Sequence, residues 1–446
     1  MKLGMTIAGL AEAVGGRLLK GDPLSPFDAF VTDTRRLLPA DFFWALKGVS
    51  YDAHDFLASA LARRPSGWLV REDAGANGAP PVVITVPDTL RALQSLAARH
   101  RRRFALPLVA ISGSNGKTTT KEMLRAVFAE AGETCASPAS FNNHFGLPLS
   151  LLELTERHKY AVFELGASRR GEIRELCSVA APGIGVLTNI GPEHLEYFGD
   201  METVFKAETE LAECLSADGT LVYNCDDPFL SRLGGPGQRT LTFGGSDRAD
   251  VRILPGEKLF LEHRGAREEI KLPVPCAHNF YNAAGAAAAA LAAGLDLALI
   301  KRGLERYTPP AMRMQELRFG GAAVILDAYN ANPASMAAAL AEMRRRPEPR
   351  YFLLGDMKEL GRHSARYHAE LGTALAGAGA AGVFLAGPEM KPAAEAYHAA
   401  GGRGLVYGST LEGWAAEARR LIRQGAGTFL IKASRSMRFE LIVDGL

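Results

Sequence analysis

The sequence predicts an α/β fold in three regions, and three observations support this prediction. The chain has 446 residues, which corresponds to two to four domains at roughly 100–200 residues each. Apolar β-rich runs alternate with helical stretches after residue 105, and the same alternation returns after residue 311. Between these two regions lies the segment YTPPAMRM (Tyr307–Met314), whose two prolines indicate a linker.

Composition narrows the class of protein. Hydrophobic residues make up 47% of the chain and charged residues 22%, which excludes a disordered or fibrous protein. A net charge of +2 provides no basic field for a nucleic acid, and the 5 scattered cysteines form no CxxC pair. Glu12 within the first apolar stretch argues against a signal peptide, and the alanine-rich run Ala283–Ile300 is too polar to span a membrane. We therefore expect a soluble, cytoplasmic protein.

The first region, up to about residue 105, is predicted to contain short strands and one longer helix. The runs AFVTDT, FFWALKG and PPVVITV are bounded by Gly, Pro or Asp, which is typical of short strands. A helix is predicted from Thr89 to Arg103, and its last turn carries the basic cluster Arg99–Arg103. Because cations favour the negative end of a helix, we interpret this cluster as a solvated helix end rather than a phosphate or nucleic-acid patch.

The second and third regions are both predicted to contain parallel sheets covered by helices. In the second region, strands are expected at LPLVAIS, YAVFELG, IGVLTNI and TLVYNCD, and Pro309 and Pro310 are expected to end the preceding alanine-rich helix. In the third region, strands are expected at AAVILDA, YFLLGD, GVFLAG, LVYGS and TFLIKAS, with a helix at Pro333–Arg346. This alternation is typical of a doubly wound, Rossmann-like sheet.

The run ISGSNGKTTT at 111–120 is the strongest functional signal. It follows an apolar strand and enters the helix KEMLRAVFAEAG, so backbone N–H groups and a positive helix end point at one place. Gly113 and Gly116 allow the backbone to approach a phosphate, Lys117 can reach terminal phosphates, and the Thr118 hydroxyl can hold Mg²⁺. An isoleucine replaces the first glycine of the usual G-x-x-x-x-G-K-[ST] motif, so a plain glycine turn is the alternative interpretation.

Two polar residues lie at other strand ends of the second region. Glu164 ends YAVFELG and His194 follows IGVLTNI, where open α/β sheets bind ligands. Together with Thr118 they form a candidate Mg²⁺ site, although imidazole is unusual for so hard a cation. Taken alone, Glu164 is better explained as a helix cap and His194 as a hydrogen-bonded loop residue.

Eight segments resemble, in order, the motifs of the Mur ligases: GSNGKTTTKEM, SFNNHFGLPLSLL, FELGASRRGEI, TNIGPEHLEYFG, HNFYNAAGAAAAA, LDAYNANPASM, GDMKELG and KASRSM. The N-terminal segments VTDTR and FFWALKGVSYDAHDF are also similar to this family, so the resemblance covers essentially the whole chain. It implies a UDP-sugar domain at 1–105, a parallel-sheet, P-loop ATP-binding domain at 106–311 and a Rossmann-like domain at 312–446 that binds the incoming dipeptide.

The resemblance also implies an activity. It is greatest to the member that joins D-alanyl-D-alanine to UDP-N-acetylmuramoyl-tripeptide in cytoplasmic peptidoglycan precursor synthesis, with ATP and Mg²⁺. In that reaction the tripeptide carboxylate takes the γ-phosphoryl group to form an acyl phosphate, which the dipeptide amine attacks. The acyl phosphate is needed because a free carboxylate is a poor electrophile. We expect small-molecule substrates, no nucleic acid, no membrane span and a monomer.

The resemblance further implies roles for individual residues. Asn282 would read the adenine edge, Arg313 would reach across to the nucleotide, and Asp327 would hold the ribose. For Tyr329 a place in the core is an open alternative, and for Lys432 and Arg435 the alternative is a solvated strand end. The catalytic residues are then Lys117, Glu164 and His194; the ATP-binding residues are Gly113, Ser114, Asn115, Gly116, Lys117, Thr118, Thr119, Asn282, Arg313 and Asp327; the metal residues are Thr118, Glu164, His194 and Glu208; and the substrate-binding residues are Thr34, Asn142, Asn143, Tyr329, Asn330, Asn332, Lys432, Ser434 and Arg435.

One departure from the family concerns a second metal site. Many relatives have a lysine, carbamylated to bridge magnesium, where Glu208 stands in VFKAETELA. Lys206 is the nearby substitute, but on a helix the two residues point roughly 200° apart at about 3.6 residues per turn. We expect Glu208 to replace the carbamate, directly or through a water. The alternative is that both residues are solvated surface charges and no second metal is held.

Two other functions are alternatives. A folylpolyglutamate-synthase-like ligase shares the phosphate loop and the two-sheet plan, but that class begins almost directly with the ATPase domain and leaves the VTDTR and ALKG segments unexplained. A P-loop kinase or nucleotide-binding regulator leaves HNFYN, LDAYNANP and KASRS without a role.

Overall fold

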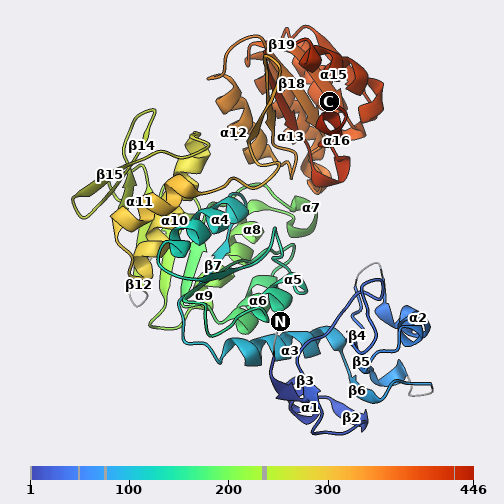
Figure 1. Ribbon diagram of the computed structural model, residues 1–446. Coiled ribbons are helices and arrows are strands. Elements are labelled where there is room, and N and C mark those ends of the chain that lie inside the picture. Colours follow the sequence, from blue (N-terminus) through green and yellow to red (C-terminus); the bar gives the residue numbers. More distant parts are fainter. Residues whose placement is uncertain (1–2, 49–50, 75–77, 234–238, 426) are drawn as a thin grey trace. The chain divides into compact units, whose positions relative to one another are not determined.

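The computed structural model describes residues 3–48, 51–74, 78–233, 239–425 and 427–446 (Figure 1). Residues 1 and 2, and residues 49 and 50 of the segment FFWALKGVSYDAHDF, lie outside these ranges. The chain divides into two compact units: the first contains Met1–Ala110, Gly132–Leu165 and Arg174–Pro182, and the second contains Ile111–Ala131, Gly166–Ile173 and Gly183–Leu446.

The first unit contains a four-stranded sheet in the order β2-β6-β5-β4. Its strands are β2 (Arg17–Lys20), β4 (Phe42–Trp44), β5 (Gly67–Arg71) and β6 (Val82–Val86), with β2 antiparallel to β6 and the others parallel. The strands expected at FFWALKG and PPVVITV are thus confirmed, whereas AFVTDT contributes only an isolated bridge from Val31 to Phe43. The smaller elements of this part are β1 (Met5–Thr6), β3 (Pro26–Phe27), α1 (Ile7–Val14) and α2 (Leu57–Ala62).

Helix α3 (Thr89–Arg101) shows that the basic cluster at its end is not simply solvated. Both His100 and Arg101 are buried. The Arg101 guanidinium donates to the carbonyls of Ala180 (3.0 Å) and Phe104 (2.6 Å), and the His100 ring lies 2.9 Å from the carbonyl oxygen of Leu154. The predicted solvated helix end is wrong for these two residues, because carbonyls brought in by distant segments satisfy them.

The remainder of the first unit carries a pair of strands, of which the sequence predicts one. Strand β8 (Thr134–Ala136) pairs in parallel with β9 (Tyr160–Glu164), which confirms the strand expected at YAVFELG. Helix α5 (Gly146–Leu151) lies between them in the chain. Strand β7 (Leu108–Ser112) and helix α6 (Glu172–Ala180) each run across a boundary between the two units.

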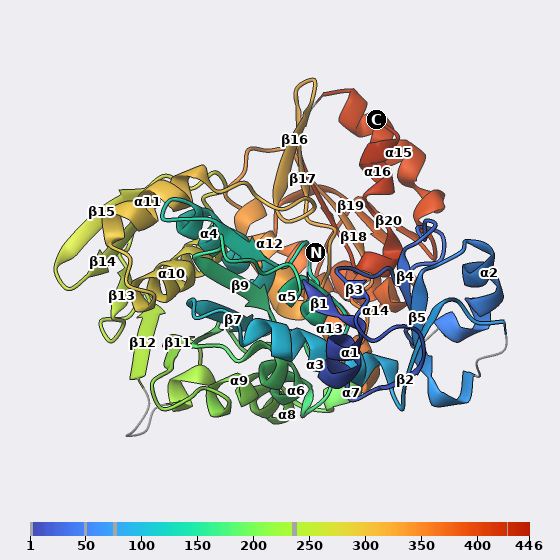
Figure 2. The same ribbon diagram turned by 60° about the horizontal axis from the view of Figure 1, so that its bottom comes forward.

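The second unit contains the parallel strands β10 (Ile184–Leu187), β11 (Thr220–Asn224), β12 (Arg239–Gly244) and β13 (Val251–Ile253). Two antiparallel strands that the sequence does not predict, β14 (Leu259–His263) and β15 (Ala266–Ile270), extend the sheet in the order β13-β14-β15 (Figure 2). Arg264 and Gly265 join them with φ values of 50° and 81°. Two consecutive positive φ values are what a tight hairpin turn requires.

Three helices of the second unit pack together: α4 (Lys117–Ala129), α10 (Ala277–Ala292) and α11 (Leu297–Arg306) (Figure 1). Residues 283–290 of α10 are buried, and Gly285 lies against the Phe243 ring, so small side chains allow close packing. The expectation that Pro309 and Pro310 end the alanine-rich helix is wrong. That helix ends at Ala292, and Asp296 caps the separate helix α11 by accepting from Leu299 N–H at 2.8 Å.

The last part of the second unit is a Rossmann-like sheet in the order β16-β17-β21-β18-β19-β20. All its strands are parallel except β16. Helices α12 and α13 lie on one face, and α15 and α16 on the other (Figure 1). The strands are β16 (Gln315–Phe319), β17 (Ala322–Leu326), β18 (Arg350–Gly355), β19 (Ala380–Ala386), β20 (Leu405–Gly408) and β21 (Thr428–Lys432), and the helices are α12 (Pro333–Met343), α13 (Ser364–Ala376), α14 (Lys391–Ala399), α15 (Ala415–Arg423) and α16 (Leu441–Asp444).

Three short helices follow β10 and carry site residues: α7 (Leu195–Phe198), α8 (Met201–Glu208) and α9 (Glu210–Glu213). Across the described ranges, none of the helices combines the length and the apolar character needed to cross a membrane.

Candidate active site

The phosphate loop has the strand–turn–helix form that the sequence predicts. It leads from β7 into α4, whose first residue is Lys117. Gly113 and Gly116 have φ values of 119° and 85°. A side chain at Gly113 would collide with the Thr188 hydroxyl, and one at Gly116 would collide with the Asn282 amide. Both positions therefore need glycine for conformation and for space.

The segment that follows β10 braces this loop from one side. The Ser114 hydroxyl exchanges hydrogen bonds with the backbone of Gly191, at 3.1 and 2.8 Å. The Asn115 N–H donates to the Asn189 side-chain oxygen at 3.0 Å, and the Thr188 hydroxyl donates to the Asn115 carbonyl at 2.7 Å. These four hydrogen bonds hold the loop to the segment that follows β10.

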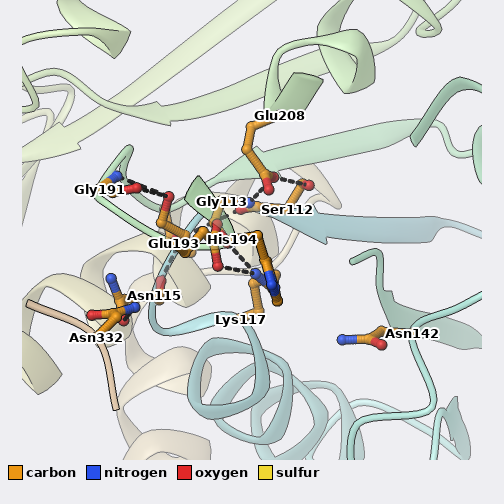
Figure 3. Close-up of polar contacts among 12 residues, drawn as sticks. Ser112, Gly113, Asn115, Lys117, Asn142, Gly191, Glu193, His194, Glu208 and Asn332 are labelled. Atoms are coloured by element: carbon orange, nitrogen blue, oxygen red, sulfur yellow. Dashed lines mark hydrogen bonds and ion pairs between the residues drawn. The ribbon is translucent and has the colours of Figure 1, made fainter. Parts of the chain in front are cut away.

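Lys117 is held by a carboxylate that the sequence analysis did not single out (Figure 3). Its ammonium lies 3.6 Å from Glu193 and donates to the Gly113 carbonyl. Burial raises the pKa of Glu193 to about 7, although the charge of Lys117 opposes this shift. The only signal in the sequence is the position of Glu193 directly before His194, which gives no indication that its side chain meets Lys117.

Glu208 ends α8 and is fully buried beneath the start of the phosphate loop. Its carboxylate accepts from the Ser112 hydroxyl at 2.5 Å and from the Gly113 N–H at 2.6 Å (Figure 3). The Lys206 side chain is 53% exposed and lies 3.9 Å from Glu202. The two residues point in different directions as predicted, and the alternative of a solvated surface charge holds only for Lys206.

Arg313 reaches the phosphate loop from beyond the linker. Its guanidinium donates to the Thr118 hydroxyl at 2.9 Å and lies over the Tyr329 ring, 4.2 Å from the centroid. The ring is half-buried and this cation lies over its face, so Tyr329 is not a plain core residue. Its contact with substrate stays a prediction.

Two asparagines make further contacts with the loop. Asn332 caps α12 and donates to the Asn115 side-chain oxygen at 2.9 Å (Figure 3). Asn282 is buried and donates to Asn279 at 3.1 Å, with its oxygen against Gly116. These contacts give Asn282 a part in holding the loop, and its role in reading adenine stays a prediction. Thr119, on the first turn of α4, is also buried.

Asp327 and Lys432 form a buried ion pair at the carboxyl ends of β17 and β21, with 2.6 Å between the charged atoms. Lys432 is 2% exposed and also donates to the Asn330 carbonyl at 2.9 Å, so a solvated strand end is the wrong description for it. Ser434 is buried and accepts from Lys358 N–H at 2.9 Å. Arg435, by contrast, has a side chain that is 52% exposed and pairs with Glu440 at 2.6 Å.

His194 begins α7 in the left-handed conformation, with φ 48°. Its Nδ1 lies 2.5 Å from a carboxylate oxygen of Glu359, which is compatible with a hydrogen-bonded loop residue. Its role at a metal site stays a prediction. Burial lowers the pKa of His194, but the bond to Glu359 and the charges of Glu193 and Glu359 outweigh this effect, and the net direction is upward. The bond to His194 lowers the pKa of Glu359.

Four predicted site residues belong to the first unit. Thr34 lies half-buried in the turn after Val31. Asn142 donates to Glu164 at 2.9 Å, and the Asn143 side chain accepts from Gly146 N–H at 2.9 Å at the start of α5. Glu164 is buried at the end of β9 and caps no helix. The convergence of these residues with those of the second unit stays a prediction.

Three buried carboxylates have oxygen atoms of the kind that magnesium prefers. Glu164, Glu193 and Glu208 each carry a buried carboxylate oxygen that no donor contacts within the described part of the chain. In the same described part, no three His, Cys, Asp or Glu side chains are grouped as a preformed metal site. Mg²⁺ in phosphoryl-transfer enzymes takes few protein ligands and completes its shell with phosphate and water, so hydroxyl and carboxylate oxygens of this kind suit it.

Comparisons with known proteins place the chain in a family. Residues 111–290 match the Mur ligase middle domain, and residues 312–435 match the Mur ligase glutamate ligase domain. The Escherichia coli (strain K12) UDP-N-acetylmuramoyl-tripeptide--D-alanyl-D-alanine ligase is 33% identical over 454 residues, which cover 100% of this chain and 98% of that protein.

Solved structures agree with this similarity. A crystal structure of MurF from Acinetobacter baumannii has a TM-score of 0.90 and 31% identity, covering 99% of this chain and 98% of the other. MurF ligase from Thermotoga maritima in complex with ADP has a TM-score of 0.81 and 26% identity, covering 93% and 96%. On its phosphate loop, its domains and its full-length relatives, the chain belongs to the Mur ligase family.

Proposed function

We propose that this chain joins D-alanyl-D-alanine to UDP-N-acetylmuramoyl-tripeptide with ATP, releasing ADP and phosphate. The observation that carries the proposal is the bond from Arg313 to Thr118, because it brings a residue from beyond the linker onto the phosphate loop. An amide ligase needs its nucleotide and its amine substrate at one place, whereas a simple P-loop kinase leaves residues 312–446 without a role. The full-length similarity to ligases named for this reaction supports the choice of substrates.

The reaction proceeds in two steps. The terminal carboxylate of the tripeptide attacks the γ-phosphorus of ATP, ADP leaves, and an acyl phosphate forms. The dipeptide amine then attacks the acyl carbon, loses a proton, and phosphate leaves. Lys117 and the backbone N–H groups of the loop stabilise the negative charge on the transferring phosphoryl group. For this, the Lys117 ammonium moves from Gly113 and Glu193 onto the phosphate.

Magnesium is the cofactor that we assign to this reaction. Bound Mg²⁺ neutralises charge on the phosphoryl group during transfer. Thr118, Glu164, His194 and Glu208 are the residues that would hold it, with Glu208 acting directly or through a water. Glu208 also accepts two hydrogen bonds at the base of the loop, so it links the metal site to the loop conformation.

Two further groups of residues are assigned to the substrates. Thr34, Asn142 and Asn143 hold the UDP-sugar-peptide. Tyr329, Asn330, Asn332, Lys432, Ser434 and Arg435 lie near the incoming dipeptide, although Lys432 acts through its pair with Asp327. The protein works on cytoplasmic precursors, as a monomer.

The test is ADP release by the purified full-length protein. Without a substitute nucleophile, multiple-turnover release is expected only when both UDP-tripeptide and D-alanyl-D-alanine are present with ATP and Mg²⁺. Without dipeptide, hydroxylamine should trap the acyl phosphate as a hydroxamate. Parallel assays with tripeptides that differ in the diamino acid would show which tripeptide the enzyme uses. In the absence of hydroxylamine, multiple-turnover ADP release that depends on a folate and glutamate, or that needs no dipeptide, would contradict the proposal.

A further inference from the structure

The segment GDMKELG, residues 355–361, has no role in the reaction described so far. It leaves the carboxyl end of β18 and contacts the turn that contains His194 and α7. The Glu196 N–H donates to the Glu359 carbonyl at 2.9 Å, and the His363 ring lies 3.1 Å from the Gly199 carbonyl. Two loops 164 residues apart in the sequence are therefore joined by one backbone–backbone hydrogen bond and by one contact from the His363 ring to a backbone carbonyl.

The approach between these loops is close. Gly361 has φ 51°, and a side chain there would place its Cβ 2.9 Å from the Glu196 Cα. Glu359 itself has φ 63°, and His194 has φ 48°. Two non-glycine residues in the left-handed region, facing each other, indicate that the surrounding structure holds both side chains where they are.

The contact between the two side chains completes this arrangement. A carboxylate oxygen of Glu359 lies 2.5 Å from Nδ1 of His194. The Phe198 ring packs edge-on to the imidazole, with 6.4 Å between the centroids. With Nδ1 fixed by the carboxylate, the only ring nitrogen left for a ligand is Nε2.

We propose that Glu359 is a positioning residue, which acts through His194 by fixing Nδ1 so that Nε2 serves the phosphoryl-transfer site. The inference rests on the proposed function for the role of His194, and it adds a residue that the reaction uses without touching substrate. Carboxylates that orient a functional histidine through its second nitrogen contribute about 10–100-fold to metal affinity or activity. Because Glu359 comes from the C-terminal region, the reaction then depends on that region through His194 as well as through Arg313.

The test compares E359Q with E196Q in the full-length protein. The amide of E359Q keeps the size of the side chain but removes the acceptor charge. Glu196 lies in the same turn as His194 with an exposed side chain, so E196Q makes the same change of charge without touching the imidazole. We expect E359Q to lower kcat by about 10–100-fold with each KM within about twofold, and E196Q to leave both unchanged.

A spectroscopic measurement tests whether Glu359 acts on the His194 imidazole itself. In ¹⁵N-histidine-labelled protein, with the His194 signals identified by H194Q, E359Q should move the His194 nitrogen resonances and E196Q should not. This measurement needs no substrate, so it stands even where the assigned substrates fail. Equal kcat for E359Q and E196Q in an active enzyme, a loss confined to KM, or unmoved His194 resonances would each overturn the inference while leaving the ligase assignment intact.

Discussion

Lys117 and Glu193 form an ion pair within the phosphate-binding site, with 3.6 Å between the ammonium nitrogen and a carboxylate oxygen. Both side chains are largely buried, at 15% and 9% exposure. The pair holds the lysine back on its own loop, where the Gly113 carbonyl also accepts from it. A nucleotide phosphate must therefore compete with a carboxylate and a carbonyl for the same ammonium.

The first prediction concerns Lys117→Ala. We expect turnover to fall by at least about 10²–10³-fold, because one charged donor to the phosphoryl group is lost. The fold should survive, since Glu193, whose burial raises its pKa to about 7, can take up a proton when its partner is removed. ADP release and circular dichroism measure the two effects. Lys206→Ala is the matched control, because its side chain is 53% exposed. Near-normal turnover in K117A would refute the phosphate-loop assignment.

The second prediction concerns Glu208 and dissolved CO₂. A permanent carboxylate needs no carbamylation, so removal of bicarbonate should leave the rate unchanged and Lys206→Ala should be mild. Glu208→Ala should raise the Mg²⁺ requirement. It should also destabilise the protein by about 1–3 kcal/mol, because the Ser112 hydroxyl and the Gly113 N–H lose a buried acceptor. Rates at varied Mg²⁺, with and without bicarbonate, provide the measurement. If bicarbonate rescues a CO₂-depleted enzyme and K206A is inactive, Lys206 is the modified residue instead.

The third prediction concerns Arg313→Ala. Loss of a charged donor at the phosphate loop should weaken ADP binding by about 10–100-fold, the range for a charge-assisted hydrogen bond of about 1.5–3 kcal/mol. Calorimetric titration with Mg-ADP measures this change. Arg318→Ala serves as control, since that side chain is 67% exposed and pairs with Glu316. Equal ADP affinity in the two variants would show that the Arg313 contact does not serve the nucleotide.

Local patterns in the sequence are sufficient to predict most of the fold. Buried parallel strands, the glycine turn and the first residues of α4 each depend on a few neighbouring residues, and the structure has them where they are expected. Helix periodicity alone also placed Lys206 and Glu208 on different sides of α8. These features need no knowledge of what packs against them.

Contacts between distant segments could not be predicted in this way. Arg101 can be buried without an unsatisfied donor because the Ala180 carbonyl, 79 residues away, accepts a hydrogen bond from it. Glu193 and Glu359 gain their importance from Lys117 and His194, which lie elsewhere in the chain. A single sequence records the charge of such residues but not their partners, so a charged surface residue and a site residue look alike.

The last prediction is a loss of stability in mild acid through His368. This residue is fully buried, and its Nε2 accepts from the Met357 N–H at 3.0 Å while Nδ1 lies 2.8 Å from the Ser364 carbonyl. One ring nitrogen accepts and the other donates, so the folded protein requires the neutral ring. Burial lowers the pKa of His368, and the nearby charges of Asp356 and Glu389 do not reverse this direction.

The direction in which stability changes with pH follows from proton uptake by the unfolded chain. As the pH falls below about 6.5, the unfolded chain binds a proton at His368 and the folded chain does not, so stability decreases. The slope for one such group approaches about 1.4 kcal/mol per pH unit. Urea denaturation between pH 8 and pH 5.5 should show a smaller acid loss for His368→Gln than for the wild type. His398→Gln, at an exposed position of α14, should follow the wild type. Parallel stability profiles for His368→Gln and the wild type would mean that this imidazole accepts a proton in the folded state.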